Sequence, residues 1–180
     1  MVKLLITNQL LGGQFCMARR VFFSFHYERD IWRASQVRNC WVTKPDRETA
    51  GFWDAAAWEE VKKKGDAAIK RWIDNQLTGT SVTAVLIGAE TSNRGYVKYE
   101  LKKSWERGNG ILGIYIHQIK DKDGKSSEKG NNAFGPIFIS HRDDKKYFYE
   151  RFPTYDWIND NGYNIIGSWI ELAAQKAGRK

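Results

Sequence analysis

The chain has 180 residues, the length of one ordinary domain, and 42% of them are hydrophobic, so most of the chain is expected to be folded and not disordered. The formal net charge of +8 permits binding to nucleic acid or to anionic nucleotides, although the Lys and Arg residues are spread out as on solvated surfaces. No apolar run approaches the length of a membrane span, so we expect no membrane association. Cys16 and Cys40 show no metal-binding or disulfide spacing, which favours a reducing, cytoplasmic setting.

The amino-terminal segment differs from the remainder of the chain. Residues 1–16 carry one Lys and a broken apolar stretch, without a convincing signal-peptide core or cleavage site. A stronger start for folded sequence appears at Met17, just before a predicted strand. We therefore expect residues 1–16 to be a leader or an upstream extension of the reading frame. Residues 17–180 are expected to form a single domain with a carboxyl-terminal helical extension.

The first predicted elements are a buried strand and a helix. Residues 21–25 are a short apolar run, which is typical of a strand covered on both faces. Residues 31–40 have apolar positions at helical spacing, and Asp30 before them could cap that helix. Residues 42–51 contain Pro45 and many polar side chains, so this stretch is predicted to be a loop.

The middle of the chain alternates helices and strands. Residues 52–54 suggest a very short strand, and residues 55–64 and 66–77 favour two helices. Residues 81–88, rich in β-branched and apolar side chains, predict a central strand. Residues 96–107 then follow a helical pattern, which the Gly-Asn-Gly sequence after them ends.

The remaining expected elements are a buried strand at 111–116, an exposed loop at 120–132, a short strand at 137–140 and a helix at 155–177 with a break at Gly162. Strands that alternate with helices indicate an α/β fold, with a parallel sheet covered on both faces. Ligands of such sheets bind beyond the carboxyl ends of the strands. This rule points to the segments that follow Phe25, Gly88 and Ile116.

Three motifs resemble those of TIR domains. Residues 22–27, Phe-Phe-Ser-Phe-His-Tyr, resemble the apolar first strand that ends in a Ser-aromatic pair, and residues 52–54, Phe-Trp-Asp, resemble the second motif. Residues 96–101, Tyr-Val-Lys-Tyr-Glu-Leu, are similar to the family's Trp-Cys-x-x-Glu-Leu helix, with the Glu at the matching offset. Tyr96 and Val97 depart from the Trp and Cys of that motif, so no role for the thiol is carried over.

Residues 18–117 resemble, more closely, the TIR-like proteins of the Thoeris anti-phage system. The strings RVFFSFHY, RNCWVTK, SVTAVLIG and YVKYELKKSWERGNGILGI carry this likeness in the same order. The resemblance implies a flavodoxin-like, three-layer TIR-like fold with a central, mostly parallel sheet. It also implies an enzyme of anti-phage defence that cleaves NAD at the nicotinamide–ribose bond and makes a cyclic ADP-ribose-type signal.

The resemblance implies Glu100 as the catalytic residue. Nicotinamide is a cationic leaving group in NAD and needs no general acid, while a fixed carboxylate can stabilise the positive charge that develops on the ribose. NAD is therefore expected as a substrate, with no cofactor and no metal. The implied partners are a phage-derived trigger, further copies of the chain in an activated homo-oligomer, and a separate effector protein reached through the signal.

Seven further residues are expected to contact the substrate: Ser24, Phe25, His26, Tyr27, Asp30, Arg38 and Asp54. Tyr27 could stack on a flat ring, and a cation such as Arg38, Lys44 or Arg47 could meet the pyrophosphate. Simpler roles compete with these. By helix position alone, Glu100 reads as a solvated carboxylate that pairs with Lys103. His26, Asp30 and Asp54 could instead cap helices. The loop cations could instead be ordinary solvated side chains.

Two other functions remain open. A non-catalytic TIR-type interaction module would pair with partners through the loop at 39–51. The net charge of +8 would also suit a basic α/β domain that binds nucleic acid. No glycine-rich nucleotide loop is present, so the chain does not resemble a dehydrogenase or an NTPase.

Overall fold

The computed structural model describes residues 19–43, 47–50, 55–135, 137–141 and 144–179. Within them, five strands form one sheet in the order β2-β1-β3-β4-β7, and every neighbouring pair is parallel. The strands are β1 (Arg19–Ser24), β2 (Arg47–Ala50), β3 (Val82–Ile87), β4 (Gly110–Tyr115) and β7 (Thr154–Asp156). This order confirms the flavodoxin-like α/β fold with a parallel sheet.

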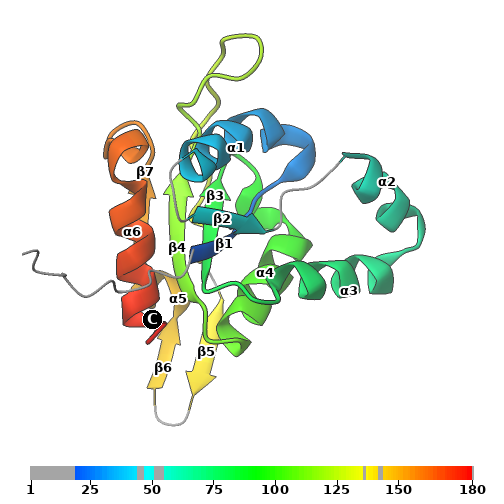
Figure 1. Cartoon of the computed structure of the whole chain (residues 1–180), viewed down its shortest axis with the longest axis vertical. Coiled ribbons are helices and arrows are strands. Elements are labelled where there is room, and N and C mark those ends of the chain that lie inside the picture. Colours follow the sequence, from blue (N-terminus) through cyan, green and yellow to red (C-terminus); the bar gives the residue numbers. More distant parts are fainter. Residues whose placement is uncertain (1–18, 44–46, 51–54, 136, 142–143, 180) are drawn as a thin grey trace, which may run out of the picture.

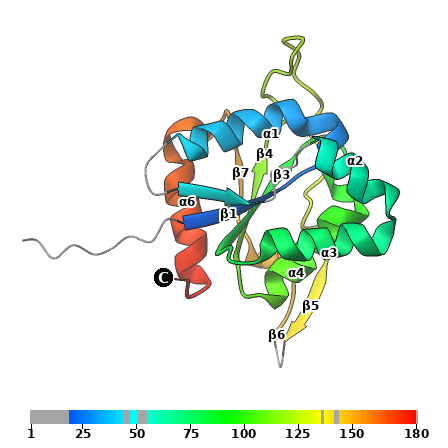
Figure 2. The same cartoon turned by 45° about the vertical axis from the view of Figure 1, so that its right-hand side comes forward.

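Helices cover both faces of this sheet (Figures 1 and 2). The helices α1 (Tyr27–Val42) and α6 (Gly162–Lys176) pack on one face, where Trp41 and Ile170 belong to the main core. The other face carries α2 (Ala55–Lys63), α3 (Asp66–Leu77) and α4 (Gly95–Glu106). None of the described helices is both long and apolar enough to span a bilayer.

The strands divide their side chains between the two faces with the period of two that a β-strand imposes. In β1, Val21 and Phe23 enter the core under α1 and α6, whereas Phe22 packs against α3. All six residues of β3 are buried, which explains why the apolar run at 81–88 predicted this strand correctly.

The start of α1 corrects one prediction. The helix begins at Tyr27, four residues earlier than expected, and His26 is its N-cap residue. Asp30 therefore does not cap the helix; it lies in the first turn, is fully buried, and has Arg33 as its ion-pair partner at 3.7 Å. Acidic residues suit the first turn because they face the positive end of the helix dipole, and so a polar stretch can begin this helix.

The two edge strands of the main sheet were missed. The stretch at 42–51, predicted to be a loop, contains β2, which pairs with β1. Tyr155, predicted to be helical, belongs to β7, which pairs with β4; the helix begins only at Gly162. Both strands are short, and they are held by the backbone of a neighbouring strand, so their side chains carry little of the alternation that a sequence pattern requires.

The strand expected at 137–140 is present, but it lies outside the main sheet. The strands β5 (Phe138–His141) and β6 (Asp144–Tyr147) form a separate antiparallel hairpin, which the short helix α5 (Phe148–Arg151) follows. This hairpin extends from the end of the molecule opposite to the loop after β4 (Figure 1).

The loop after β4 is tied to α1 by one buried side chain. Arg33, 4% exposed, donates from Nε to the carbonyl oxygen of Ile119 at 2.9 Å. Its Nη2 donates to the carbonyl oxygen of Lys125 at 3.0 Å and to the Asp121 carboxylate at 3.2 Å. The polar residues 120–132 therefore have a fixed anchor at the carboxyl edge of the sheet, where parallel α/β folds bind ligands.

Candidate functional site

A cavity of about 220 Å³ opens beside the carboxyl end of β1. Its walls come from the segment after β1 and from α2, α3 and α4. The lining residues are Phe25, His26, Tyr27, Glu28, Trp58, Lys62, Ile69, Arg94, Tyr96, Val97 and Glu100. Thus the structure brings together four residues that the sequence analysis singled out, Phe25, His26, Tyr27 and Glu100, and it does so at the predicted sheet edge.

Glu100 lies in the second turn of α4 and is only 1% exposed. The Ser24 hydroxyl, at the end of β1, donates a hydrogen bond to its Oε2 at 2.5 Å. Burial raises the pKa of Glu100 to about 8, and the bond from Ser24 opposes this rise only in part. The simpler role, a solvated partner of Lys103, is wrong, because Lys103 pairs with Glu106 at 2.8 Å.

Aromatic rings form one wall of the cavity. The Trp58 ring lies 6.2 Å from the Tyr27 ring and 6.4 Å from the Tyr96 ring, between centroids, and Phe25 lies 6.3 Å from Tyr27. Trp58 is 6% exposed and also belongs to the core cluster beneath α3. A flat, apolar ring can pack against such a wall while Glu100 faces the group attached to it.

His26 lines the cavity from the amino end of α1. Burial lowers its pKa, and the positive charge of Arg94 lowers it further, so the imidazole is neutral near pH 7. His26 is 9% exposed, and its Nδ1 has no hydrogen-bond partner within the described part of the chain. A residue that lines the cavity thus has a buried nitrogen without a partner among the described residues.

Three expected contacts that the structure describes do not line this cavity: Ser24, which meets it only through its bond to Glu100, Asp30 and Arg38. Asp30 is buried against Gly88, outside the lining. Arg38 lies on α1 about 16 Å along the helix axis from Tyr27, at 1.5 Å per residue. Asp54 lies outside the described residues, so its predicted contact stays a prediction.

The loop cation Arg47 also supplies no contact here. The Arg47 guanidinium lies 4.3 Å from the centre of the Trp41 ring, and it fills the space that a side chain on Gly167 would occupy. It is therefore packed between α1 and α6, on the opposite face of the sheet from α4. Lys44 lies outside the described residues.

The sequence analysis missed Trp58, Lys62 and Arg94 as cavity residues. Trp58 belongs to the core cluster beneath α3 and also lines the cavity, and its sequence context, a helix-prone stretch, indicates only the first of these places. Lys62 stands in a run of three lysines, and nothing in that run distinguishes it from a solvated residue. The signal for Arg94 was its place at the start of α4, near a sheet edge that binds ligands.

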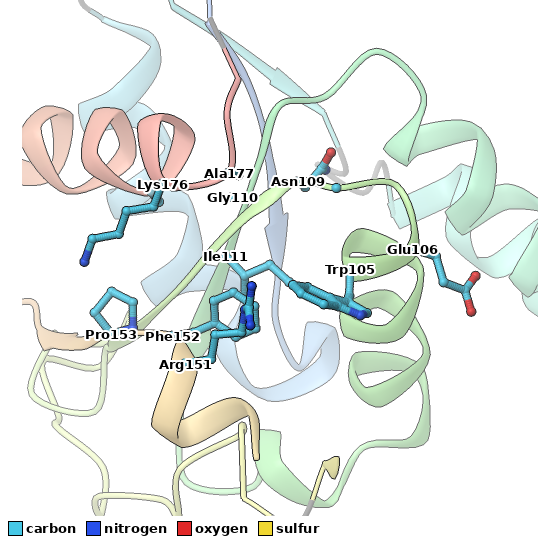
Figure 3. A pocket seen from close by; sticks show the side chains of 12 residues that line it. Trp105, Glu106, Asn109, Gly110, Ile111, Arg151, Phe152, Pro153, Lys176 and Ala177 are labelled. Atoms are coloured by element: carbon cyan, nitrogen blue, oxygen red, sulfur yellow. The ribbon is translucent and has the colours of Figure 1, made fainter. Parts of the chain in front are cut away.

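A larger hollow of about 660 Å³ lies at the opposite edge of the sheet, around the start of β4. Figure 3 shows Arg151 and Phe152 beside Trp105 there, and the Arg151 guanidinium lies 4.7 Å from the centre of the Trp105 ring. The carboxylate that lines this larger hollow is Glu106, and a hydrogen bond from Lys103 lowers its pKa, as in an ordinary surface ion pair. The raised carboxyl pKa and the free imidazole nitrogen therefore point to the smaller cavity.

Among the described residues, no three side chains of His, Cys, Asp or Glu lie close enough together to bind one metal ion. The chemistry available at the cavity is that of a buried carboxyl group, a hydroxyl, a neutral imidazole and aromatic rings. Such a set can hold a flat ring and stabilise a positive charge beside it.

Comparison with known proteins shows the family of this chain. The family described as "Thoeris protein ThsB, TIR-like domain" matches residues 22–121, which include every lining residue of the cavity. A protein of Bacillus cereus (strain MSX-D12), named "Putative cyclic ADP-D-ribose synthase ThsB1", is 40% identical over 191 aligned residues. That alignment covers 86% of this chain and 100% of the relative. The chain therefore belongs to the family of Thoeris ThsB proteins with a TIR-like domain.

Proposed function

We propose that this protein is an enzyme of anti-phage defence that cleaves the nicotinamide–ribose bond of NAD and makes a cyclic ADP-ribose-type signal, with Glu100 as its catalytic residue. The observation that carries the proposal is the carboxyl group of Glu100, fully buried at an aromatic cavity with Ser24 as its hydrogen-bond partner. The name of the Bacillus cereus relative, "Putative cyclic ADP-D-ribose synthase ThsB1", supports the choice of substrate and product.

The electrostatics of Glu100 suit a cationic substrate. Its raised pKa reflects burial without a neighbouring cation, so the free carboxyl group is largely protonated at neutral pH. The nicotinamide ring of NAD brings a positive charge, which favours the ionised form of Glu100 once the substrate is bound. Substrate binding then releases a proton and places a carboxylate beside the ribose.

Cleavage breaks the bond between the ribose C1 and the nicotinamide nitrogen, and the electron pair leaves with nicotinamide. The Glu100 carboxylate stabilises the oxocarbenium character that develops on the ribose, and Ser24 holds that carboxylate in position. A hydroxyl group of the same ADP-ribose then forms a bond to C1 and releases its proton, which closes the ring. Water reaching the same carbon would instead give linear ADP-ribose.

The aromatic wall favours ring closure over hydrolysis. Tyr27, Trp58 and Tyr96 surround the ring-binding space with apolar surface, which excludes water from the reacting carbon. In the defence role, a phage-derived cue raises the activity by assembling copies of the chain. The cyclic product then activates a separate effector protein.

Release of nicotinamide from NAD tests the proposal. Purified protein is incubated with NAD, alone and with extract of phage-infected cells, beside the Glu100→Gln and Glu106→Gln variants. Glu106 is the matched control, because it lies on the same helix but its carboxylate is exposed and paired with Lys103. We expect Glu106→Gln to release nicotinamide at the wild-type rate. The rate of Glu100→Gln should fall by at least about 100-fold, the order of magnitude expected when one contact that stabilises the transition state is removed. Equal nicotinamide release by all three proteins under both conditions would refute the proposal that this protein cleaves NAD through Glu100.

A further inference from the structure

We infer that the amino-terminal turn of α4, with Arg94 and with Lys62 of α2, binds the pyrophosphate of the dinucleotide at the rim of the Glu100 cavity. This inference rests on the proposed function, because it divides the same substrate between two places: a buried place for the nicotinamide and its ribose, and a charged rim for the phosphates.

The size of the cavity requires such a division. At about 220 Å³, it is smaller than the roughly 300–1,000 Å³ of sites that enclose a drug-sized ligand. A dinucleotide is larger than one ring and its sugar, so the cavity cannot hold all of it. With the nicotinamide ribose beside Glu100, the phosphates attached to that ribose must lie at the rim.

The start of α4 is suited to an anion. Lys98 makes the first intrahelical bond, to the carbonyl oxygen of Arg94, so the N–H groups of the three residues between them have no acceptor within the helix. No side chain caps this end, and its first turn contains no acidic residue. By contrast, the first turn of α1 carries Glu28 and Asp30. Of the two helix starts at the cavity, α4 is therefore the one whose partial positive charge is uncompensated.

Arg94 adds a full charge at the same place. It lines the cavity, and Glu90 accepts hydrogen bonds from both Arg94 and Arg29, so one carboxylate serves two guanidinium groups. The Nε of Arg94 is buried and has no partner among the described residues. The backbone beside it is open, since nothing lies within 4 Å of where a side chain on Gly95 would begin. A phosphate can therefore approach both the guanidinium and the helix end.

Lys62 and His26 complete the rim. Lys62 lines the cavity from α2, where Glu28 holds its ammonium group at 3.0 Å in an exposed pair that a phosphate can replace. His26 is nine-tenths buried in the same lining, and its unpartnered Nδ1 can donate to a phosphate oxygen as the neutral imidazole. Cations from two helices thus border one opening, where the two phosphates of a dinucleotide would emerge.

Calorimetric binding to a non-cleaving protein tests this inference directly. In the Glu100→Gln background, Arg94→Gln, Lys62→Gln and Lys98→Gln are titrated with ADP-ribose and with nicotinamide riboside, which has no phosphate. Lys98 is the matched control: it is an exposed cation one turn after Arg94 that does not line the cavity. We expect Arg94→Gln to weaken ADP-ribose binding about 10- to 100-fold and Lys62→Gln about 10-fold. The affinity of Lys98→Gln for ADP-ribose should stay within about threefold of that of its parent. All variants should bind nicotinamide riboside with equal affinity.

Three results would overturn the inference. The first is that Arg94→Gln and Lys62→Gln bind ADP-ribose as tightly as Lys98→Gln does. The second is that these two variants lose affinity for nicotinamide riboside as much as for ADP-ribose. The third is that the Glu100→Gln parent does not bind ADP-ribose. Thermal unfolding of each variant shows whether it is folded, and Arg94→Lys, which keeps the charge, should recover part of the affinity. Nicotinamide release by the wild type is measured separately. If the rim variants bind ADP-ribose normally while the wild type releases nicotinamide, only the inference on the pyrophosphate fails. If the wild type releases no nicotinamide, the proposed cleavage fails, and the binding data still test the pyrophosphate site.

Discussion

Replacing Glu100 with Gln should make the protein more stable in alkaline solution, because the wild type keeps an acid where water cannot reach it. The pKa of this carboxyl group is about 8 in the folded chain, against 4.5 for the unperturbed group. Between these values the folded state binds a proton that the unfolded state has lost, so wild-type stability falls as the pH rises. At about 1.4 kcal/mol per pKa unit, the loss is about 3 to 4 kcal/mol between roughly pH 5 and pH 8.

Gln has nearly the same shape as the protonated acid and does not ionise, so its variant lacks this slope. We expect the difference in unfolding free energy, Glu100→Gln minus wild type, to grow by about 3 kcal/mol over that range. Urea titrations of both proteins at several pH values measure it. The contributions of other buried groups, such as Asp30 and His26, cancel in the difference. A difference independent of pH would refute the conclusion that Glu100 is buried without a cation.

Three further outcomes follow from other contacts. Ser24→Ala removes the bond that favours the Glu100 carboxylate, so the acid limb of the pH profile for NAD cleavage should move to higher pH; an unmoved limb contradicts this. Arg33→Ala should cost about 3 to 5 kcal/mol by leaving the buried Asp30 carboxylate and the Ile119 carbonyl without a partner, and hydrogen exchange should quicken in the loop after β4; protection as in the wild type would refute the anchor. Gly110→Ala should cost about 1 to 3 kcal/mol in urea unfolding because its new carbon meets the α6 backbone, whereas Gly95→Ala should stabilise by about 0.5 kcal/mol; equal effects would contradict the packing.

The interior strands and long helices were predictable from the sequence, and the edges of the sheet were not. Every side chain of β3 is buried, so its apolar run is itself the structural signal. Among the described strands, β2 and β7 each pair with one neighbour, and the backbone of these short strands forms its hydrogen bonds with that neighbour. Whether such a segment forms a strand is decided by hydrogen bonds to the partner strand, and the local sequence pattern does not show this.

The candidate site divides in the same way. Glu100 was identified because its motif followed the earlier motifs in order; by helix position alone it resembled a solvated carboxylate. Its hydrogen-bond partner, Ser24, is 76 positions away in the chain, so no local pattern predicts this contact. The cation expected at the pyrophosphate was Arg38, Lys44 or Arg47, whereas the described cations that line the cavity are Lys62 and Arg94. Which lysine or arginine of a basic chain faces a cavity depends on helix rotation and packing, which composition does not record.

The products of NAD test the central claim most directly. Wild-type protein and Glu100→Gln are incubated with NAD and infected-cell extract in water labelled with oxygen-18, and the nucleotide products are weighed by mass spectrometry. Ring closure predicts nicotinamide and, only with the wild type, a nucleotide that weighs one water less than ADP-ribose and carries no label. Labelled linear ADP-ribose as the only product would contradict the cyclic signal, and identical products from Glu100→Gln would contradict the role of Glu100.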